Sequence, residues 1–302
     1  MKNINLFFVF LIILLSACKD QEKNDAHAGH DHEFTLVAFD YDQEAYEPVP
    51  IKYQITGQGD TLLFFVHGWN INQTYWAQQV QYFADRYRVA TIDLPGHGSS
   101  GSERKNWTPE SYAKDLRSVI ERENLENVVL IGHSMSGDIT LQTALMLPEK
   151  IVGLVGVDNY QNIDFEMNDE MRFQLSDVIN AFEDDYVNTT EGFARQFLLQ
   201  KTASEDIKTL VISDYKNADP NIAIPVLKHT FPSFARIKEK LPQLHIPLQL
   251  ISCTRGETNE ETLKKLCPKG VNIRYIDGSG HFPMIEKPEE FNRTLEELLR
   301  ML

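Results

Sequence analysis

The fold of this chain is decided by the ten residues from Val128 to Gly137, VVLIGHSMSG. Four apolar residues open the stretch and predict a buried strand, and a helical pattern follows from Asp138 to Leu147. Between them, Ser134 stands at the tip of a turn bounded by small residues. A strand, a tight turn with a serine at its tip and a helix make a nucleophile elbow, which leaves the serine hydroxyl and the next backbone N–H exposed.

The elbow pattern departs from its usual form at one position. Strand and helix pass close together at the turn, so small residues are needed two positions before and two positions after the nucleophile. Gly132 meets the first need, whereas Ser136 takes the second place, where the motif has glycine. Serine is also small, but the departure leaves a second interpretation open, in which Ser134 lies in an ordinary strand-to-helix loop.

The size and charge of the chain narrow the classes of protein to consider. Its 302 residues, 42% of them hydrophobic, are enough for one large core or for one core with an insertion. The formal net charge of -15 argues against a nucleic-acid partner, because phosphates require a basic patch. The folded region carries neither the spacing of metal ligands nor a dinucleotide-binding loop, so we expect no cofactor and no metal.

The N-terminus is predicted to lie outside the folded domain. Lys2 precedes a run of ten apolar residues, which is too short to span a bilayer but suits the core of a signal peptide. The run leads into Leu-Ser-Ala-Cys, ending at Cys18, which resembles the lipobox of bacterial lipoproteins, whose cysteine is lipid-modified and becomes the mature N-terminus. A plain secretory signal is the alternative. We expect residues 1–17 to be a lipoprotein signal peptide and the protein to be lipid-anchored in the bacterial cell envelope, facing the periplasm or the exterior.

Residues 18–33 are predicted to be a disordered tether between the lipid and the domain. They contain no aliphatic side chain larger than alanine and therefore cannot bury surface. The segment holds His27, His30 and His32 beside acidic residues, a composition that can bind zinc or copper. We favour a polar linker that contains histidines, because a flexible site must first meet the cost of its own ordering.

Residues 34–302 alternate apolar strands with helices. The expected strands are 49–56, 61–66, 88–92, 128–131, 151–157, 247–252 and 272–276. This alternation predicts an α/β fold with a mostly parallel, doubly wound sheet. The pattern becomes helical, acidic and rich in aromatics over about residues 160–241, which predicts a helical cap inserted after the sixth strand. Such sheets bind their ligands at the carboxyl ends of the strands, where the elbow serine also lies.

A serine nucleophile needs a base that takes its proton, and the base needs an orienting acid. His281 is the leading candidate for the base, because it lies late in the chain in a loop of small residues directly after a strand. His67, His97 and His133 also lie at this edge, but each borders a turn where backbone geometry is the main demand. The chain order nucleophile, acid, histidine favours His281.

Four motifs, taken in this order, resemble the α/β-hydrolase fold superfamily in its lidded, single-domain, serine esterase-like group. They are His67-Gly68-Trp69, Asp93-Leu94-Pro95-Gly96-His97-Gly98, Gly132-His133-Ser134-Met135-Ser136 and Gly280-His281-Phe282. The resemblance covers the chain from about residue 48 to its end. It implies Ser134 as the nucleophile, His281 as the general base and then acid, and an oxyanion hole built from the backbone N–H groups of Trp69 and Met135.

The acid is the point at which the sequence departs from the pattern of this superfamily. Most members carry an aspartate a few residues after the strand that we expect to end at Ser252, whereas this chain has Glu257 there and no aspartate. Some relatives place the acid after the preceding strand, where this chain has Asp158. We favour Asp158, because it follows an uninterrupted apolar strand and would be poorly solvated, and we keep Glu257 as the alternative acid.

The resemblance implies a cofactor-independent serine hydrolase that cleaves a carboxylic ester or a related acyl substrate through an acyl-enzyme on Ser134. An acyltransferase or a C–C bond hydrolase would use the same residues. The missing aspartate and Ser136 support a second interpretation, a non-catalytic ligand-binding protein on the same fold. Serine at position 134 excludes the alkyl-ester chemistry of related dehalogenases and epoxide hydrolases, which need an aspartate nucleophile.

Overall fold

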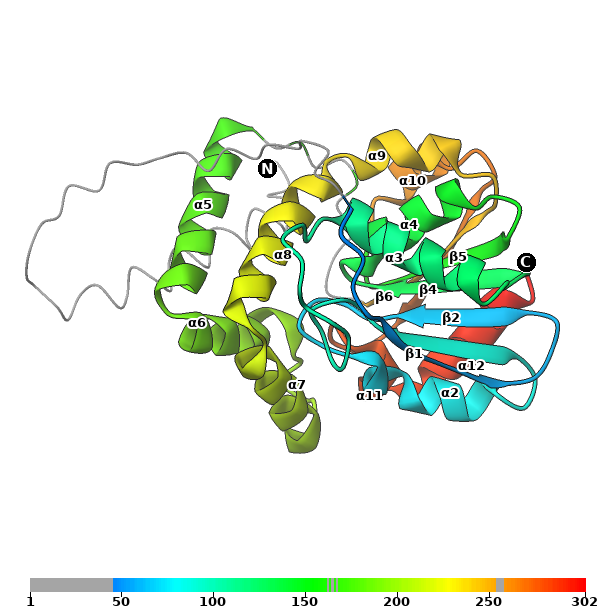
Figure 1. Cartoon of the computed structure of the whole chain (residues 1–302), viewed down its shortest axis with the longest axis horizontal. Coiled ribbons are helices and arrows are strands. Elements are labelled where there is room, and N and C mark those ends of the chain that lie inside the picture. Colours follow the sequence, from blue (N-terminus) through cyan, green and yellow to red (C-terminus); the bar gives the residue numbers. More distant parts are fainter. Residues whose placement is uncertain (1–45, 162, 164–165, 167, 254–257) are drawn as a thin grey trace, which may run out of the picture.

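The computed structural model of the protein describes residues 46–161, 163, 166, 168–253 and 258–302 (Figure 1). The predicted signal peptide, Cys18, the histidines of the predicted tether and Glu257 lie outside these residues. In the described part of the chain, no helix is both long enough and apolar enough to cross a membrane.

Seven described strands form one sheet, in the order β1-β3-β2-β4-β5-β6-β7. The strands are β1 Lys52–Gly57, β2 Leu62–Val66, β3 Arg88–Asp93, β4 Val128–His133, β5 Ile151–Val157, β6 Leu248–Cys253 and β7 Val271–Ile276. β1 pairs antiparallel with β3, and every other neighbouring pair is parallel. All residues of β2, β4 and β6 are buried, as expected for central strands that are covered on both faces.

Helices cover both faces of this sheet (Figure 1). They are α3 Pro109–Arg122 and α4 Ser136–Met146 on one face, and α2 Ala77–Phe83, α11 Pro283–Glu286 and α12 Pro288–Leu299 on the other. The helix α3 begins at Pro109, which takes its first position, and the Thr108 side chain caps it. The prediction of a mostly parallel, doubly wound sheet is confirmed.

Aromatic residues fill the core between the sheet and the helices α2 and α12. The rings of Phe65, Trp76, Phe83 and Phe291 are fully buried, and neighbouring ring centroids lie 5.0–6.4 Å apart. Tilted rings at these distances add to the stabilisation that burial of their area supplies. This core supports β2, whose carboxyl end carries the loop that begins at His67.

An insertion between β5 and β6 forms the cap. Its helices are α5 Asp169–Asp184, α6 Tyr186–Phe193, the π-helix η2 Ala194–Leu198, α7 Glu205–Asn217, α8 Pro220–Phe234, α9 Ile237–Lys240 and the 3-10 helix η3 Leu241–Gln243. Figure 1 shows α5 to α8 gathered beyond the carboxyl ends of the parallel strands. The cap follows β5 rather than a sixth strand, because five strands precede the insertion in the described part of the chain, which begins at residue 46.

The cap is joined to the sheet through Trp69, which lies in the loop after β2. The Trp69 ring makes edge contacts with Phe182, Phe193 and Tyr215 of the cap, at centroid distances of 5.5–6.0 Å. Its indole Nε1 donates a hydrogen bond to the carbonyl oxygen of Ala223 at 3.0 Å. The aromatic residues of the cap therefore form its own core and its seam with the sheet, as the helical spacing of apolar residues indicates.

Candidate active site

Ser134 lies in a strained turn between β4 and α4. Its φ of 55° is in the left-handed region, which is uncommon for a residue with a side chain, and such strained residues cluster at active sites. Its backbone N–H donates to the carbonyl oxygen of Val157 at 2.9 Å, which holds the turn against β5. A Cβ on Gly132 would lie 2.5 Å from the carbonyl oxygen of Ser136, so glycine is required where strand and helix pass.

Ser136 occupies the second small-residue position without disturbing the turn. Its side chain is fully buried, and its hydroxyl donates to the carbonyl oxygen of His67 at 2.5 Å. The serine that departs from the motif therefore ties the start of α4 to the loop that carries Trp69. Serine at position 136 is therefore compatible with a nucleophile elbow and does not favour an ordinary strand-to-helix loop at Ser134.

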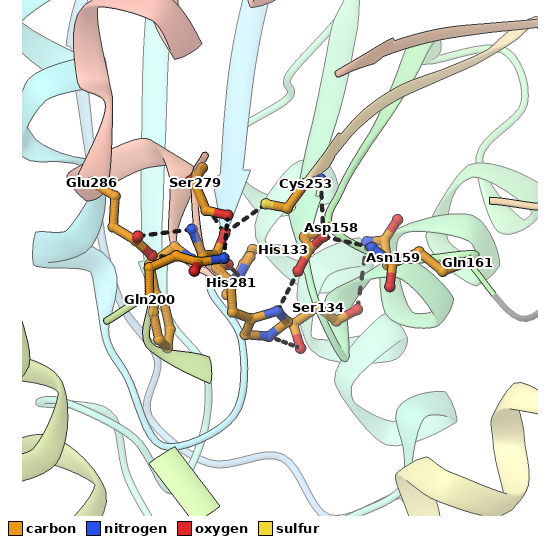
Figure 2. Close-up of polar contacts among 12 residues, drawn as sticks. His133, Ser134, Asp158, Asn159, Gln161, Gln200, Cys253, Ser279, His281 and Glu286 are labelled. Atoms are coloured by element: carbon orange, nitrogen blue, oxygen red, sulfur yellow. Dashed lines mark hydrogen bonds and ion pairs between the residues drawn. The ribbon is translucent and has the colours of Figure 1, made fainter. Parts of the chain in front are cut away.

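A chain of hydrogen bonds joins Ser134, His281 and Asp158 (Figure 2). His281 Nε2 lies 2.8 Å from the Ser134 hydroxyl, and His281 Nδ1 lies 2.5 Å from Asp158 Oδ2. When Nδ1 carries the proton and donates to the carboxylate, Nε2 is left to accept the serine proton. Ser134 follows β4, Asp158 follows β5 and His281 follows β7. The sheet therefore brings the three residues together at one edge, although they are far apart in the sequence.

The carboxylate of Asp158 is fixed by its surroundings. Its side chain is 3% exposed, and its Oδ1 accepts hydrogen bonds from the backbone N–H of Cys253 at 3.1 Å and from Gln161 Nε2 at 2.5 Å. Its backbone N–H donates to the carbonyl oxygen of Ile251 at 2.8 Å. These contacts direct the second carboxylate oxygen to His281. The alternative acid, Glu257, lies outside the described residues.

The two residues expected to supply the N–H groups of an oxyanion hole, Trp69 and Met135, belong to the loop after β2 and to the start of α4. Met135 follows the serine directly at the N-terminus of α4, where N–H groups lack intrahelical partners and the helix dipole favours negative charge. Trp69 follows Gly68, and a Cβ on Gly68 would lie 3.1 Å from the Ser134 Cβ. The loop after β2 therefore passes within contact distance of the nucleophile.

The three other histidines at this edge are buried, and their ring nitrogens contact backbone groups. His67 Nε2 accepts a hydrogen bond from the backbone N–H of Leu94 at 2.9 Å, and His133 Nε2 contacts the carbonyl oxygen of His281 at 2.7 Å. Burial lowers the pKa of His67 to about 4 and that of His97 to about 3, and it holds the pKa of His133 well below its usual value. All three histidines are therefore neutral near pH 7, which agrees with the prediction that backbone geometry explains them.

Sequence reasoning missed the side chains that surround the three central residues. Asn159 Nδ2 donates to the carbonyl oxygen of Gly132 at 2.8 Å, and the Cys253 thiol donates to the carbonyl oxygen of Gly280 (Figure 2). Gln161 and Asn159 carry a weak signal, since both are amides within three residues after Asp158 in the sequence. A cysteine at a strand end carries no comparable signal.

This fold and this site define a protein of the alpha/beta hydrolase class. Residues 63–294 match the model of the alpha/beta hydrolase family, and the chain belongs to that family.

Relatives of the chain include methyl ester esterases and receptors. The chain is 28% identical to a pimeloyl-[acyl-carrier protein] methyl ester esterase of Vibrio cholerae, over 82% of this chain and 97% of the relative. It is 23% identical to the Karrikin insensitive 2 receptor CA of Petunia hybrida, over 78% of this chain and 90% of the relative. The prediction of a hydrolase enzyme is confirmed by the esterases among these relatives.

Solved structures with the same fold include a thermophilic esterase from Thermogutta terrifontis and a bromoperoxidase from Bacillus anthracis. The esterase superposes with a TM-score of 0.72 at 20% identity, covering 84% of this chain and 94% of that chain. The bromoperoxidase superposes with a TM-score of 0.73 at 20% identity, covering 84% of this chain and 96% of that chain. At these identities the likeness establishes the fold.

Proposed function

We propose that this hydrolase is a serine esterase that cleaves a small or medium carboxylic ester through an acyl-enzyme on Ser134. The observation that carries the proposal is the continuous chain of hydrogen bonds from the Ser134 hydroxyl through His281 to Asp158. Such a chain lets the imidazole remove the serine proton while the carboxylate stabilises the imidazolium that forms. The methyl ester esterases among the relatives support a carboxylic ester as the substrate class.

In the first half of the reaction, the Ser134 oxygen attacks the ester carbonyl carbon as its proton passes to His281 Nε2. The carbonyl oxygen becomes an oxyanion beside the backbone N–H groups of Trp69 and Met135, and each such donor is worth about 3 kcal/mol of transition-state stabilisation. The tetrahedral intermediate then breaks its C–O bond to the alcohol. The alcohol leaves with the proton from His281, and the acyl group stays on the serine oxygen.

In the second half, water replaces the alcohol. His281 Nε2 takes a proton from the water as its oxygen attacks the acyl carbon, and the same proton returns to Ser134 when the acyl–serine bond breaks. The products are a carboxylic acid and the starting enzyme. Asp158 keeps its negative charge throughout, and it orients the ring through Nδ1. In this proposal Asp158, and not Glu257, is the acid.

A serine-directed fluorophosphonate probe tests the proposal. The folded protein should be labelled, and Ser134→Ala should abolish both the labelling and the hydrolysis of p-nitrophenyl esters. A panel of these esters with rising acyl length would then define the size of the acyl site. Folded protein that resists the probe would instead favour a non-catalytic ligand-binding protein on this fold.

We also propose that the protein is exported and lipid-anchored at Cys18. The support is in the sequence alone, in the apolar run and the Leu-Ser-Ala-Cys that ends it. Acyl chains contribute about 0.8 kcal/mol per buried CH₂, so that several chains hold a protein firmly on a membrane. Cys18→Ser should move the protein out of the membrane fraction, and its retention there would contradict the proposal.

A further inference from the structure

The loop that carries His281 is held by a carboxylate from outside the cap. Here the core is the part of the protein that contains the sheet and its covering helices. Glu286, at the end of α11, accepts hydrogen bonds from two backbone N–H groups: Gly280 N lies 2.7 Å from Oε2, and Phe282 N lies 3.2 Å from Oε1. These two groups flank His281 directly in the chain. Each carboxylate oxygen therefore binds the loop on one side of the histidine (Figure 2).

The cap holds the same loop from another direction. The backbone N–H of His281 donates to the carbonyl oxygen of Leu198 at 2.9 Å, and Gln200 Nε2 donates to the carbonyl oxygen of Ser279 at 3.1 Å. Leu198 ends η2, and Gln200 follows two residues later, so both belong to the cap. The three successive N–H groups of residues 280–282 are thus shared between the core and the cap.

Gly280 shows how closely these two partners approach. A Cβ on this residue would lie 2.5 Å from Glu286 Oε1 and 2.8 Å from the carbonyl oxygen of Leu198. No residue with a side chain fits between a core carboxylate and a cap carbonyl at those distances. The glycine before the histidine is therefore required by the contact between loop, core and cap.

Placement of this loop decides placement of the base. His281 Nε2 must stay near the Ser134 hydroxyl, and a catalytic group must be held to within about 0.5 Å of its productive position. Phe282 is fully buried next to the histidine, and hydrogen bonds from outside the loop fix the backbone of residues 279–282. Since one set of these bonds comes from the cap, the position of the base depends on where the cap is seated.

We propose that Glu286 and Gln200 are positioning residues for His281, one from the core and one from the cap, and that seating of cap residues 198–200 on the loop completes the alignment of the base. The proposal rests on the proposed function of His281 as the general base. It links the cap to the chemical step. Displacement of the cap would leave the base held by the core contacts alone.

Two substitutions test the two sides of the loop. Glu286→Gln keeps the shape of the side chain but offers one acceptor oxygen to two backbone N–H donors, so one hydrogen bond is lost. We expect kcat for a p-nitrophenyl ester to fall about 10- to 100-fold with KM within about twofold, because the base is misplaced and substrate contacts are kept. Gln200→Ala removes one neutral hydrogen bond and should lower kcat about three- to tenfold.

Matched controls carry the same chemical changes away from the loop. Glu290→Gln lies on α12, where the carboxylate is 3.7 Å from Lys287 Nζ. Asn217→Ala lies at the end of α7 in the cap, where the amide donates to the Ser213 hydroxyl at 3.2 Å. Both should keep the wild-type kcat. Urea unfolding of each variant measures its global stability separately from these effects.

Hydrogen–deuterium exchange gives a readout that does not depend on activity. The amides of residues 280–282 should exchange about five- to tenfold faster in Glu286→Gln and Gln200→Ala than in the wild-type protein, and at the wild-type rate in both controls. Wild-type exchange and wild-type kcat in folded Gln200→Ala would overturn the role of the cap, even if Glu286→Gln fails to fold. Faster exchange without a fall in kcat would overturn positioning of the base.

Failure of the proposed function is distinguishable from failure of this inference. If the wild-type protein neither hydrolyses esters nor reacts with the fluorophosphonate probe, the proposed function fails. The exchange rates in Gln200→Ala would still show whether cap and loop are coupled. If wild-type hydrolysis is normal and the variants match it, the proposed function stands and the positioning roles are wrong.

Discussion

Asp158 is held in place by hydrogen bonds of its backbone as well as by those of its side chain. Its φ of 48° turns the chain sharply after β5, and its N–H is bonded to Ile251 on the neighbouring strand. One carboxylate oxygen is occupied by Cys253 and Gln161, which leaves the other for His281 Nδ1. A carboxylate that cannot rotate selects the tautomer and the orientation of the ring that faces it.

Asp158→Asn should therefore lower kcat for a p-nitrophenyl ester by about 10⁴-fold while leaving the fold intact. The amide keeps the size of the side chain, but it favours the wrong tautomer of His281 and cannot stabilise the imidazolium. Glu257→Gln is the control and should keep nearly full activity. The opposite pair of results would assign the acid to Glu257.

At the scale of secondary-structure elements, a buried ion pair joins the segment before α3 to α3 itself. Arg104 Nη1 lies 2.6 Å from Asp115 Oδ2, and both side chains are 0% exposed. The guanidinium lies 4.7 Å from the ring centroids of both Trp107 and Tyr112, on which it stacks. This arrangement fixes α3, which packs against the elbow helix α4.

Asp115→Asn should lower the free energy of unfolding by about 3–5 kcal/mol, because it leaves the Arg104 charge buried without its counter-charge. Urea unfolding monitored by circular dichroism measures the change. Glu261→Gln breaks the exposed pair with Lys265 and should leave the unfolding curve in place. Equal curves for wild type and Asp115→Asn would show that the buried pair contributes no net stability.

Elements that depend on local sequence were predictable, whereas contacts made by tertiary packing were not. Apolar runs predicted the strands, because this signal acts within a few residues. Asp158 and Glu257 each come shortly after an apolar run in the sequence, so spacing alone left the acid open. Glu286 was missed because its role depends on the short helix α11 turning back towards the loop of His281.

At the scale of the whole molecule, three buried histidines lie along the carboxyl edge of the sheet. His67 and His97 have ring centroids 5.2 Å apart, and those of His133 and His281 are 4.6 Å apart. Burial lowers the pKa of His67, His97 and His133, as their loss of water disfavours the charged ring. The fold therefore keeps these three histidines neutral below about pH 6.5, where they are protonated in the unfolded chain.

This difference predicts how stability depends on pH. Below pH 6.5 the unfolded chain binds protons that the folded protein excludes, so the free energy of unfolding falls as pH falls. The stabilisation from His67 and His97 is lost down to their folded pKa values of about 4 and about 3, and His133, whose pKa burial also lowers, contributes in the same direction. Each histidine adds about 1.4 kcal/mol per pH unit to the slope within that window. Above pH 6.5 the three contribute no slope, because both states are neutral.

Urea unfolding between pH 7.5 and 5 measures the slope, and His97→Phe isolates one contribution to it. Phenylalanine keeps a ring in the buried site beside Tyr112 but does not titrate. The variant should lose about 1.4 kcal/mol per pH unit from the slope at the acidic end, because other titrating groups contribute equally to both proteins. Parallel pH profiles for wild type and variant would mean that His97 accepts a proton in the folded state, and that the edge of the sheet is more open to water than its burial implies.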